Sequence, residues 1–249
     1  MTAIVAEDLA RELETLDLEG RLRVVSLLPG RKVFTTSLGI EDQVITAAIA
    51  RTGAAIAVVT LDTQRLFPQT AALIDQTERR YGLAIERFRP AQHDVDAYVA
   101  RFGLNGFYES VEARHACCDV RKLKPLAQAL QGADFWITGV RRDQSGNRSA
   151  TPLCERDAAR GLVKVNPLAD VTLERIRDYA GAHDVPLNPL HARGYPSIGC
   201  EPCTRAIKPG EPERAGRWWW ERDQTRECGL HVKPTAPSAI PHNAQAPTS

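Results

Sequence analysis

The chain has 249 residues, of which 43% are hydrophobic and 25% are charged, and its formal net charge is +1. This length allows one large globular domain or two small ones, and the balanced charge gives no reason to expect nucleic-acid or membrane-surface binding. The acidic start lacks the regions of a secretory signal, and the longest apolar run, at 54–59, is too short to span a bilayer. We therefore expect a cytoplasmic protein whose six cysteines are reduced and serve as ligands or catalysts.

Short apolar segments alternate with helical patterns along most of the chain. The patterns predict strands over 32–37, 54–63, 83–88, 134–140 and 162–168. Helices are predicted over 41–53, 68–82, 118–132 and 172–184, with helical turns over 94–103 and an interruption at Pro125. This alternation indicates an α/β fold with a parallel sheet covered by helices on both faces. The pattern becomes loop-like after about residue 190, and the proline-rich residues 234–249 are expected to be disordered.

Two pairs of cysteines stand out because of their spacing. Cys117 and Cys118 are adjacent, whereas Cys200 and Cys203 form a CxxC motif. Four thiolates suit either a tetrahedral zinc ion or an iron–sulfur cluster, and the alternative is that one pair is an incidental buried pair. Neighbouring cysteines rarely reach one small ion together, but a helix that starts at 117–118 would reach two iron corners of a cuboidal cluster. We therefore favour the cluster, and we interpret Cys154 as a structural or surface thiol.

Polar loops follow three of the predicted strands. They are "TSLGIED" at 36–42, "LDTQRLFP" at 61–68 and "TGVRRDQSGNR" at 138–148. Open parallel sheets bind ligands beyond the carboxyl ends of their strands, helix starts attract anions, and arginine suits phosphate and sulfate oxygens. Each loop alone is compatible with a plain turn or helix cap. Three of them at one edge of a sheet predict a site for a nucleotide-like anion.

These stretches, together with "CCDVRKLKPL", "GCEPCTR", "ERAGRWWWE" and "RECGLH", resemble the assimilatory adenylyl-sulfate reductases, which are thioredoxin-dependent relatives of phosphoadenylyl-sulfate reductase. The resemblance runs from about Phe34 to His231. It implies an adenine-nucleotide α-hydrolase-like (PP-loop) fold, one 4Fe-4S cluster per chain, and reduction of adenylyl sulfate to sulfite and AMP with thioredoxin as the thiol donor.

The resemblance also assigns roles to residues of this chain. The cluster ligands map onto Cys117, Cys118, Cys200 and Cys203, and the nucleophile maps onto Cys228, with His231 as either an acid–base group or an exposed side chain. The substrate-binding residues map onto Ser37, Leu38, Gly39, Glu41, Asp42, Leu61, Asp62, Thr63, Arg65, Lys122, Gly139, Arg141, Arg142, Arg214 and Arg217. Two positions depart from the family pattern: Gln64, where glycine is common, and Leu38, where phenylalanine is common.

The implied chemistry explains why a cysteine lies in the tail. A thiolate attacks the sulfur of the phosphosulfate anhydride, expels AMP and keeps the sulfonate, and a thioredoxin thiol then attacks the enzyme's own sulfur to release sulfite. Cys228 must therefore meet two partners in turn, which suits a segment outside the core. Nearby positive charge, for which Arg226, His231 and Lys233 are candidates, would activate it. The "RWWW" stretch at 217–220 is either a lid over the site or an apolar anchor for the tail.

The sequence thus predicts a nucleotide-binding and iron–sulfur domain at 1–207, an active-site lid or tail at 208–233 and a disordered end at 234–249. Three alternatives remain. A reductase of the 3′-phosphorylated substrate generally lacks the two cysteine pairs, and a PP-loop tRNA thiolase would need an SGGxDS loop in place of "SLGIED". A zinc-bound binding module would leave "RECGLH" unexplained. No nucleic-acid or membrane partner is expected, and a homo-oligomer is compatible with the sequence.

Overall fold

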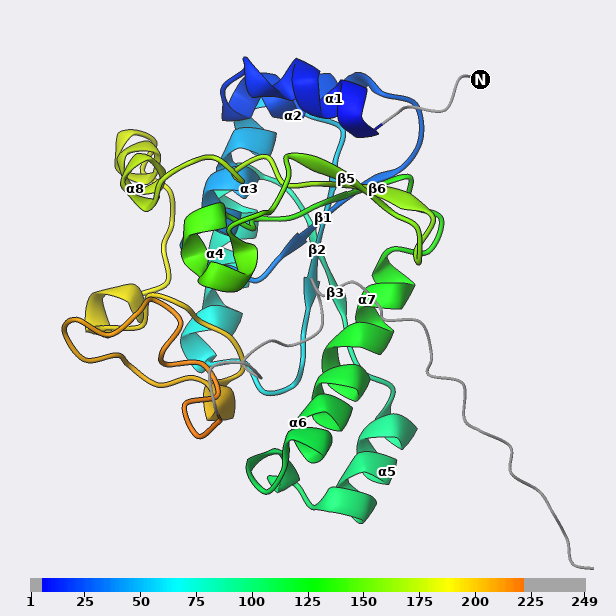
Figure 1. Cartoon of the computed structure of the whole chain (residues 1–249), viewed down its shortest axis with the longest axis vertical. Helices are drawn as coiled ribbons and strands as arrows, with labels where there is room; N and C mark the ends of the chain where they lie inside the picture. Colours follow the sequence, from blue (N-terminus) through cyan, green and yellow to red (C-terminus); the bar gives the residue numbers. More distant parts are fainter. Residues whose placement is uncertain (1–5, 222–249) are drawn as a thin grey trace, which may run out of the picture.

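The computed structural model describes residues 6–221, and its centre is a six-stranded sheet in the order β3-β2-β1-β4-β6-β5 (Figure 1). The strands are β1 (Lys32–Thr36), β2 (Ala57–Leu61), β3 (Ile85–Phe88), β4 (Phe135–Ile137), β5 (Cys154–Asp157) and β6 (Leu162–Val165). All neighbouring strands are parallel except β5, which pairs antiparallel with β6 at the edge. The predicted α/β sheet is therefore confirmed, with one antiparallel edge strand that the sequence did not indicate.

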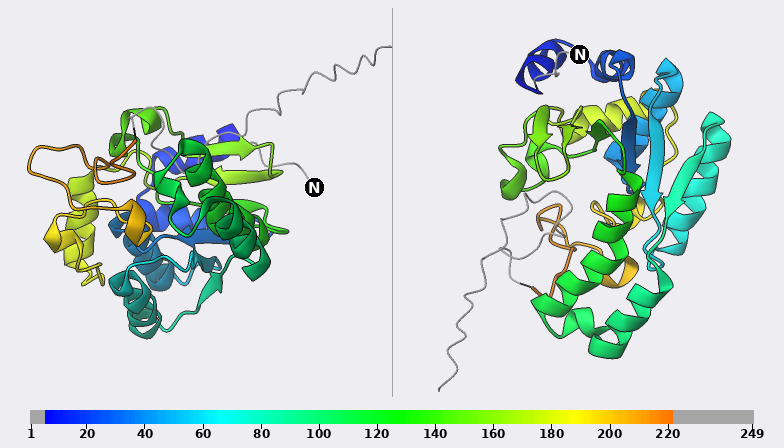
Figure 2. Two further views of the ribbon diagram at one scale, coloured as in Figure 1. Left: turned by 90° about the horizontal axis from the view of Figure 1, so that it is seen from below. Right: turned by 90° about the vertical axis from the view of Figure 1, so that its right-hand side faces the viewer.

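Helices cover both faces of the sheet (Figure 2). They are α1 (Ala6–Glu14), α2 (Leu18–Leu27), α3 (Ile40–Thr52), α4 (Pro68–Tyr81), α5 (Gln92–Phe102), α6 (Val111–Cys118), α7 (Lys124–Ala129) and α8 (Leu173–Ala182). The larger core lies between one face of the sheet and α3, α4 and α8, and includes Phe34 and Ile137. A smaller core on the opposite face joins α7 to Val33, Val59 and Trp136. Alternate residues of β1 thus point to different cores, as a sheet buried on both faces requires.

The order in which the chain adds strands to the sheet reverses between β1 and β4, and this determines where a ligand can bind. The chain runs outward from β1 through β2 to β3, and then resumes on the other side of β1 with β4 and β6. The loops after β1 and β4 therefore diverge at the carboxyl edge of the sheet and leave a crevice between them, which is the usual ligand site of such sheets.

The helix that carries the adjacent cysteines differs from the prediction of a helix over 118–132. Helix α6 begins after Ser110, whose hydroxyl accepts a hydrogen bond from the Ala113 N–H, and it ends at Cys118. One π-helical segment, Asp119–Leu123, follows, and Pro125 lies in the first turn of α7. Cys117 and Cys118 therefore lie at a helix end rather than at a helix start, and the interruption near Pro125 is confirmed.

Short 3₁₀ turns connect the remaining elements, at Gly106–Tyr108, Arg142–Gln144, Gly146–Arg148, His191–Arg193 and Glu201–Cys203. The predicted loop character after residue 190 is confirmed for the part of the chain that is described. Within residues 6–221, none of the helices combines the length and the apolar character needed to cross a bilayer.

Candidate active site

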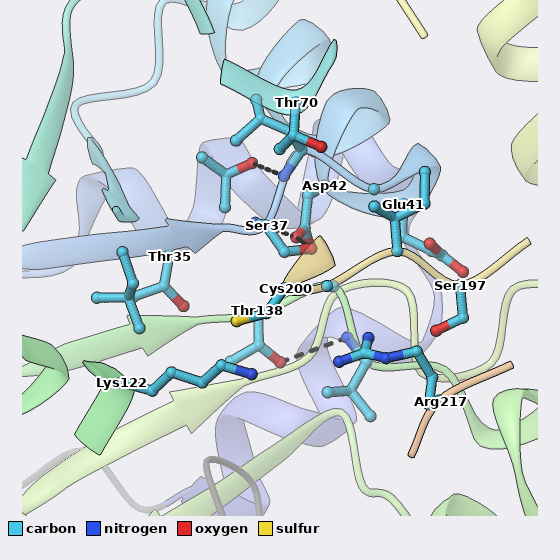
Figure 3. Close-up of a pocket in the computed structure, with 18 of the residues that line it drawn as sticks. Thr35, Ser37, Glu41, Asp42, Thr70, Lys122, Thr138, Ser197, Cys200 and Arg217 are labelled. Carbon is cyan, nitrogen blue, oxygen red and sulfur yellow. Dashed lines mark hydrogen bonds between the residues drawn. The ribbon is translucent and has the colours of Figure 1, made fainter. Parts of the chain in front are cut away.

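A large pocket opens at the carboxyl edge of the sheet, where the chain leaves β1, β2 and β4 (Figure 3). Its lining extends over the exits of all three strands and over two segments from the C-terminal part of the described chain. The three predicted strand-exit loops line it together with residues 196–200 and with the segment 213–218. Most of the binding residues inferred from the resemblance line this pocket, namely Ser37, Leu38, Gly39, Glu41, Asp42, Leu61, Thr63, Lys122, Gly139, Arg214 and Arg217.

The loop after β1 is organised around the carboxylate of Asp42. Ser37 donates its backbone N–H and its hydroxyl to Asp42 Oδ2, both at 2.6 Å. Gly39 is the N-cap of α3 and has no capping side chain, so the first turn of that helix has backbone N–H groups available for an anion. Burial raises the pKa of Asp42 to about 6, although the Ser37 hydrogen bonds lower it.

Four of the predicted binding residues do not line this pocket: Asp62, Arg65, Arg141 and Arg142. Asp62 accepts a hydrogen bond from Arg89 Nε at 2.8 Å, and Arg142 donates from Nε to the Thr151 carbonyl at 2.8 Å. Arg65 donates to Asn105 Oδ1 at 2.8 Å and lines a second pocket, described below. A direct contact of these side chains with a nucleotide stays a prediction, because each is held by another protein group.

Arg141 also lies outside the pocket lining, but for a different reason. Its side chain is fully buried, and it contacts the carboxylates of Glu41 at 2.8 Å, of Glu213 at 3.2 Å and of Asp143. Gln144 donates to the same Glu41 oxygen at 2.9 Å. The guanidinium therefore offsets part of the negative charge of the pocket wall, and it links the start of α3 to the C-terminal segment. It is positioned to support an anion site rather than to touch the anion.

Several lining residues were missed by the sequence analysis. Thr138 and Arg148 belong to the predicted strand-exit loop at 138–148, of which only Gly139 and the arginine pair are among the predicted binding residues. Glu213 and Trp218 belong to the "ERAGRWWWE" stretch, and residues 196–199 precede the CxxC motif. Their proximity in sequence to recognised motifs was the available signal.

Positive charge gathers at one end of the pocket. Lys122 and Arg217 point toward one another from opposite sides, with Cys200 beside them (Figure 3). Gly199 permits this arrangement, because a β-carbon there would overlap the Arg217 guanidinium. Arg214 lines the same pocket. Guanidinium and ammonium groups grouped in this way favour the oxygens of phosphate or sulfate.

All four cysteines of the two pairs line a second, smaller pocket that adjoins the first. Lys122 and Cys200 belong to the lining of both pockets. The Cys200 thiol donates to Thr63 Oγ1 at 3.4 Å, and Arg121 donates to the Thr63 carbonyl at 2.9 Å, so the loop after β2 joins the two cysteine segments. No disulfide joins these cysteines.

The surroundings of the cysteines are both buried and positively charged. Burial raises the pKa of Cys117, and it raises the pKa of Cys203 to about 12. Arg121 and Lys122 act in the opposite direction on Cys117, and Lys122 and Arg217 do so on Cys203. Thiolates in this pocket therefore need further positive charge, such as a bound metal supplies. In residues 6–221, no three His, Cys, Asp or Glu side chains are arranged to hold a single metal ion.

Strained backbone and two unpaired buried donors lie at the walls of the two pockets. Leu38, Gln64 and Trp218 have positive φ angles of 60°, 60° and 43°, and all three lie in or beside the pocket walls. Such angles cost free energy for residues with a side chain and are common at binding sites. Among the described residues, Trp218 Nε1 and Arg217 Nε have no hydrogen-bond partner although both are buried. These donors are suited to acceptors on a bound group.

Cys154 lies apart from both pockets. It is buried in the larger core on β5, and burial raises the pKa of its thiol to about 12, in agreement with a structural role. Cys228 and His231, with the remainder of the predicted tail from 222 to 233 and the predicted disordered end at 234–249, lie outside the described residues.

Comparison with known proteins identifies the family. The chain is 66% identical over 235 residues to the adenosine 5′-phosphosulfate reductase of Rhizobium meliloti, covering 94% of this chain and 89% of that protein. It is 68% identical over 233 residues to the enzyme of the same name from Agrobacterium fabrum, covering 92% and 90%. A crystal structure of phosphoadenylyl-sulfate reductase from Candida auris has the same fold, with a TM-score of 0.69 at 23% identity over 83% of this chain and 98% of that one. The model of the phosphoadenosine phosphosulfate reductase domain matches residues 31–206, and the chain belongs to this family.

Proposed function

We propose that this protein reduces adenosine 5′-phosphosulfate to sulfite and AMP, as a thioredoxin-dependent enzyme of sulfate assimilation. The observation that carries the proposal is the shared wall of the two pockets, where Lys122 and Cys200 line both the larger pocket and the cysteine pocket. The relatives at 66% and 68% identity carry the name of this activity. Reduced cysteines and a thioredoxin partner are both consistent with the cytoplasm.

The larger pocket would bind the nucleotide with its phosphosulfate toward the positive end. The start of α3 and the loop after β1 are suited to hold the phosphate by backbone N–H groups. Lys122, Arg214 and Arg217 would contact the sulfate end, where negative charge must be matched. Arg141 would reduce the repulsion between the anion and the carboxylates of Glu41 and Glu213, since its positive charge lies between them.

The cysteine pocket fits a 4Fe-4S cluster better than a zinc ion. Cys117, Cys118, Cys200 and Cys203 surround one pocket but do not converge in the manner of the ligands of a single ion. A cuboidal cluster has a separate iron corner for each thiolate. The unpaired Trp218 Nε1 donor and the nearby cations would stabilise its charge. When bound, the cluster would supply charge beside the substrate's sulfate.

The sulfur is transferred to the chain itself in this proposal. The Cys228 thiolate attacks the sulfur of the substrate, a new S–S bond forms, and the S–O bond to the phosphate breaks, so that its electron pair leaves with AMP. A thioredoxin thiolate next attacks Cys228 Sγ and displaces sulfite, and its second thiol closes a thioredoxin disulfide and restores the Cys228 thiolate. Two electrons from the dithiol thus reduce the sulfate group to sulfite.

One single-turnover experiment tests this function. Enzyme mixed with adenosine 5′-phosphosulfate, without reductant, should release one AMP per active site and gain a sulfonate on Cys228, seen by peptide mass spectrometry. Cys228→Ser should bind the nucleotide but gain no adduct, because its hydroxyl is hardly ionised at neutral pH. Full turnover by this variant, or an adduct on Cys154, would overturn the proposal.

The second candidate is the reduction of the 3′-phosphorylated substrate, because the matching family model and the Candida auris structure carry that name. Steady-state competition between the two nucleotides separates the candidates. We expect a higher kcat/KM for the form without the 3′-phosphate. A clear preference for the 3′-phosphorylated form would reassign the substrate.

A further inference from the structure

Tyr98, on α5, carries a buried hydroxyl that forms no hydrogen bond within residues 6–221. The residue is 4% exposed, and its Oη has no partner there. The ring is held by packing against Phe102, one turn later on the helix, with 5.5 Å between the ring centroids. Buried polar groups are nearly always hydrogen-bonded, so this hydroxyl points to a bond that forms only when another group is present.

The hydroxyl lies on the side of α5 that faces the cysteine segment. Helix α5 packs against α6 and against the π-helical segment that follows it (Figure 1). Tyr98 Oη is 3.6 Å from the point that a β-carbon would occupy on Gly106, in the turn that precedes α6. Phe107, the next residue of that turn, and Cys117 both line the cysteine pocket. The hydroxyl is therefore directly behind one wall of this pocket.

The two groups that act on the hydroxyl from this wall have opposite hydrogen-bonding roles. Burial raises the pKa of Tyr98 to about 12, a Cys117 thiolate adds to the rise, and the Phe107 backbone N–H opposes it. Tyr98 thus keeps its proton at neutral pH and can act as a donor. The N–H can only donate to the tyrosine oxygen, so the sulfur of Cys117 is the acceptor to which the tyrosine proton can go.

The charge of the sulfur decides whether this bond forms. A neutral thiol is a weak acceptor, whereas hydrogen bonds to an ionised acceptor are shorter and about twice as strong. Arg121 also contacts Cys117, but a ligand sulfur can accept more than one hydrogen bond. Another cysteine of the pocket already has a hydroxyl beside it, since Cys200 Sγ is 3.4 Å from Thr63 Oγ1.

We propose that Tyr98 is a positioning residue, whose hydroxyl donates a hydrogen bond to the sulfur of Cys117 when that sulfur is an iron ligand, and so helps the cysteine pocket to retain its iron. The inference rests on the proposed function, because it takes Cys117 as a ligand of the cluster. Hydrogen bonds of this kind orient metal ligands and tune iron–sulfur clusters, and losing one typically costs about 10-fold to 100-fold in metal affinity.

The test compares Tyr98→Phe with Tyr81→Phe in the anaerobically purified, full-length protein. Tyr81 is a matched control: its hydroxyl is also buried without a partner among the described residues, but it packs against the larger core and lines neither pocket. Both substitutions keep the ring and remove one oxygen. The measurements are the rate of iron release to an excess of chelator and the visible absorption bands of the bound cluster.

For Tyr98→Phe we expect iron release to be about tenfold faster and the sulfur-to-iron absorption bands to shift, because the sulfur loses a hydrogen bond. Tyr81→Phe should release iron within about twofold of the wild-type rate, with unshifted bands.

Iron release from Tyr98→Phe at the wild-type rate would overturn the inference, as would equally fast release from both variants. Faster release with unshifted bands would also overturn it, because that result indicates general loosening of the wall. So would a Tyr98→Phe chain that does not fold, since the hydroxyl would then be required by the protein itself. A wild-type protein without iron would instead refute the cluster of the proposed function.

Discussion

Gly139 and Asp42 lie so close together that a β-carbon on the glycine would overlap the aspartate carboxylate. Gly139 follows β4, whereas Asp42 lies in the first turn of α3. The contact therefore joins the loops that follow β1 and β4, the two strands between which the strand order reverses. Ser37 holds the same carboxylate by two hydrogen bonds of 2.6 Å. The aspartate cannot move away from the glycine without losing these bonds, and the pocket wall therefore requires glycine at this position.

Gly139→Ala should lower the free energy of unfolding by about 1 to 3 kcal/mol and weaken nucleotide binding, because the added methyl group forces the two loops apart. Gly146→Ala is the matched control, since it lies in the same loop and a β-carbon there has no atom within 4 Å. Urea unfolding and nucleotide titration measure the two effects. Equal results for the two substitutions would contradict the assignment of Gly139 as a close-contact position.

Asp42 also predicts a pH dependence of stability. Its pKa is raised from 3.8 to about 6, mainly by burial, with Glu41 adding to the rise and Arg148 opposing it. Between these pH values the folded chain holds a proton that the unfolded chain has released, so this group's contribution to stability is lost as the pH rises from about 4 to about 6. Asparagine does not ionise in this range. The free energy of unfolding of Asp42→Asn, relative to that of the wild type, should therefore rise by roughly 2 to 3 kcal/mol over this interval. Parallel stability curves of the two proteins from pH 4 to pH 7 would show that Asp42 does not titrate there.

The adjacent arginines Arg141 and Arg142 should differ strongly in their importance. Arg141→Ala leaves the buried carboxylate of Glu41 and the partly buried carboxylate of Glu213 without their cation, which should cost about 3 to 5 kcal/mol of stability and raise KM. Arg142 is exposed and its Nε donates to the Thr151 carbonyl, so Arg142→Ala should cost less than about 1 kcal/mol. Denaturant unfolding and steady-state kinetics of both variants provide the measurement. A larger effect of Arg142→Ala would show that the structure assigns the wrong arginine to the site.

The strands and helices that were predicted well have strong local signals. The run at 32–37 is β-branched and bounded by Pro29 and Gly39, and helix α4 begins at Pro68 and is followed by Gly82. Strand β5 was missed because its sequence, "CERD", has no strand pattern and forms only by pairing with β6. The predicted helix over 118–132 begins too late, because the residues that follow the N-cap Ser110, "VEARHA", include too few large apolar side chains to show a helical pattern.

The site itself was predictable to the level of segments but not of individual side chains. Which of two adjacent arginines is buried depends on Glu213, a partner 72 residues away in the sequence. Gln64 has a φ of 60°, a conformation that glycine adopts without strain. This angle accounts for the glycine that is common at the position in the family, and the glutamine of this chain adopts the same angle at a cost in free energy. Tertiary distances of this kind cannot be derived from local pattern.

The iron content of the purified protein tests the cysteine pocket most directly. Anaerobically purified protein should be brown and contain about four iron and four sulfide ions per chain. Serine in place of Cys117, Cys118, Cys200 or Cys203 should lower iron, sulfide and activity together, because a hydroxyl is a poor ligand for a soft iron–sulfur cluster. Cys154→Ser is the control: that thiol is as buried as those of Cys118, Cys200 and Cys203 but lies in the apolar core on β5, so the variant should lose stability and keep its iron. Metal analysis and the visible absorption spectrum report on the cluster independently of turnover. Stoichiometric zinc without iron in the wild-type protein, or full iron in all four pocket variants, would refute the cluster.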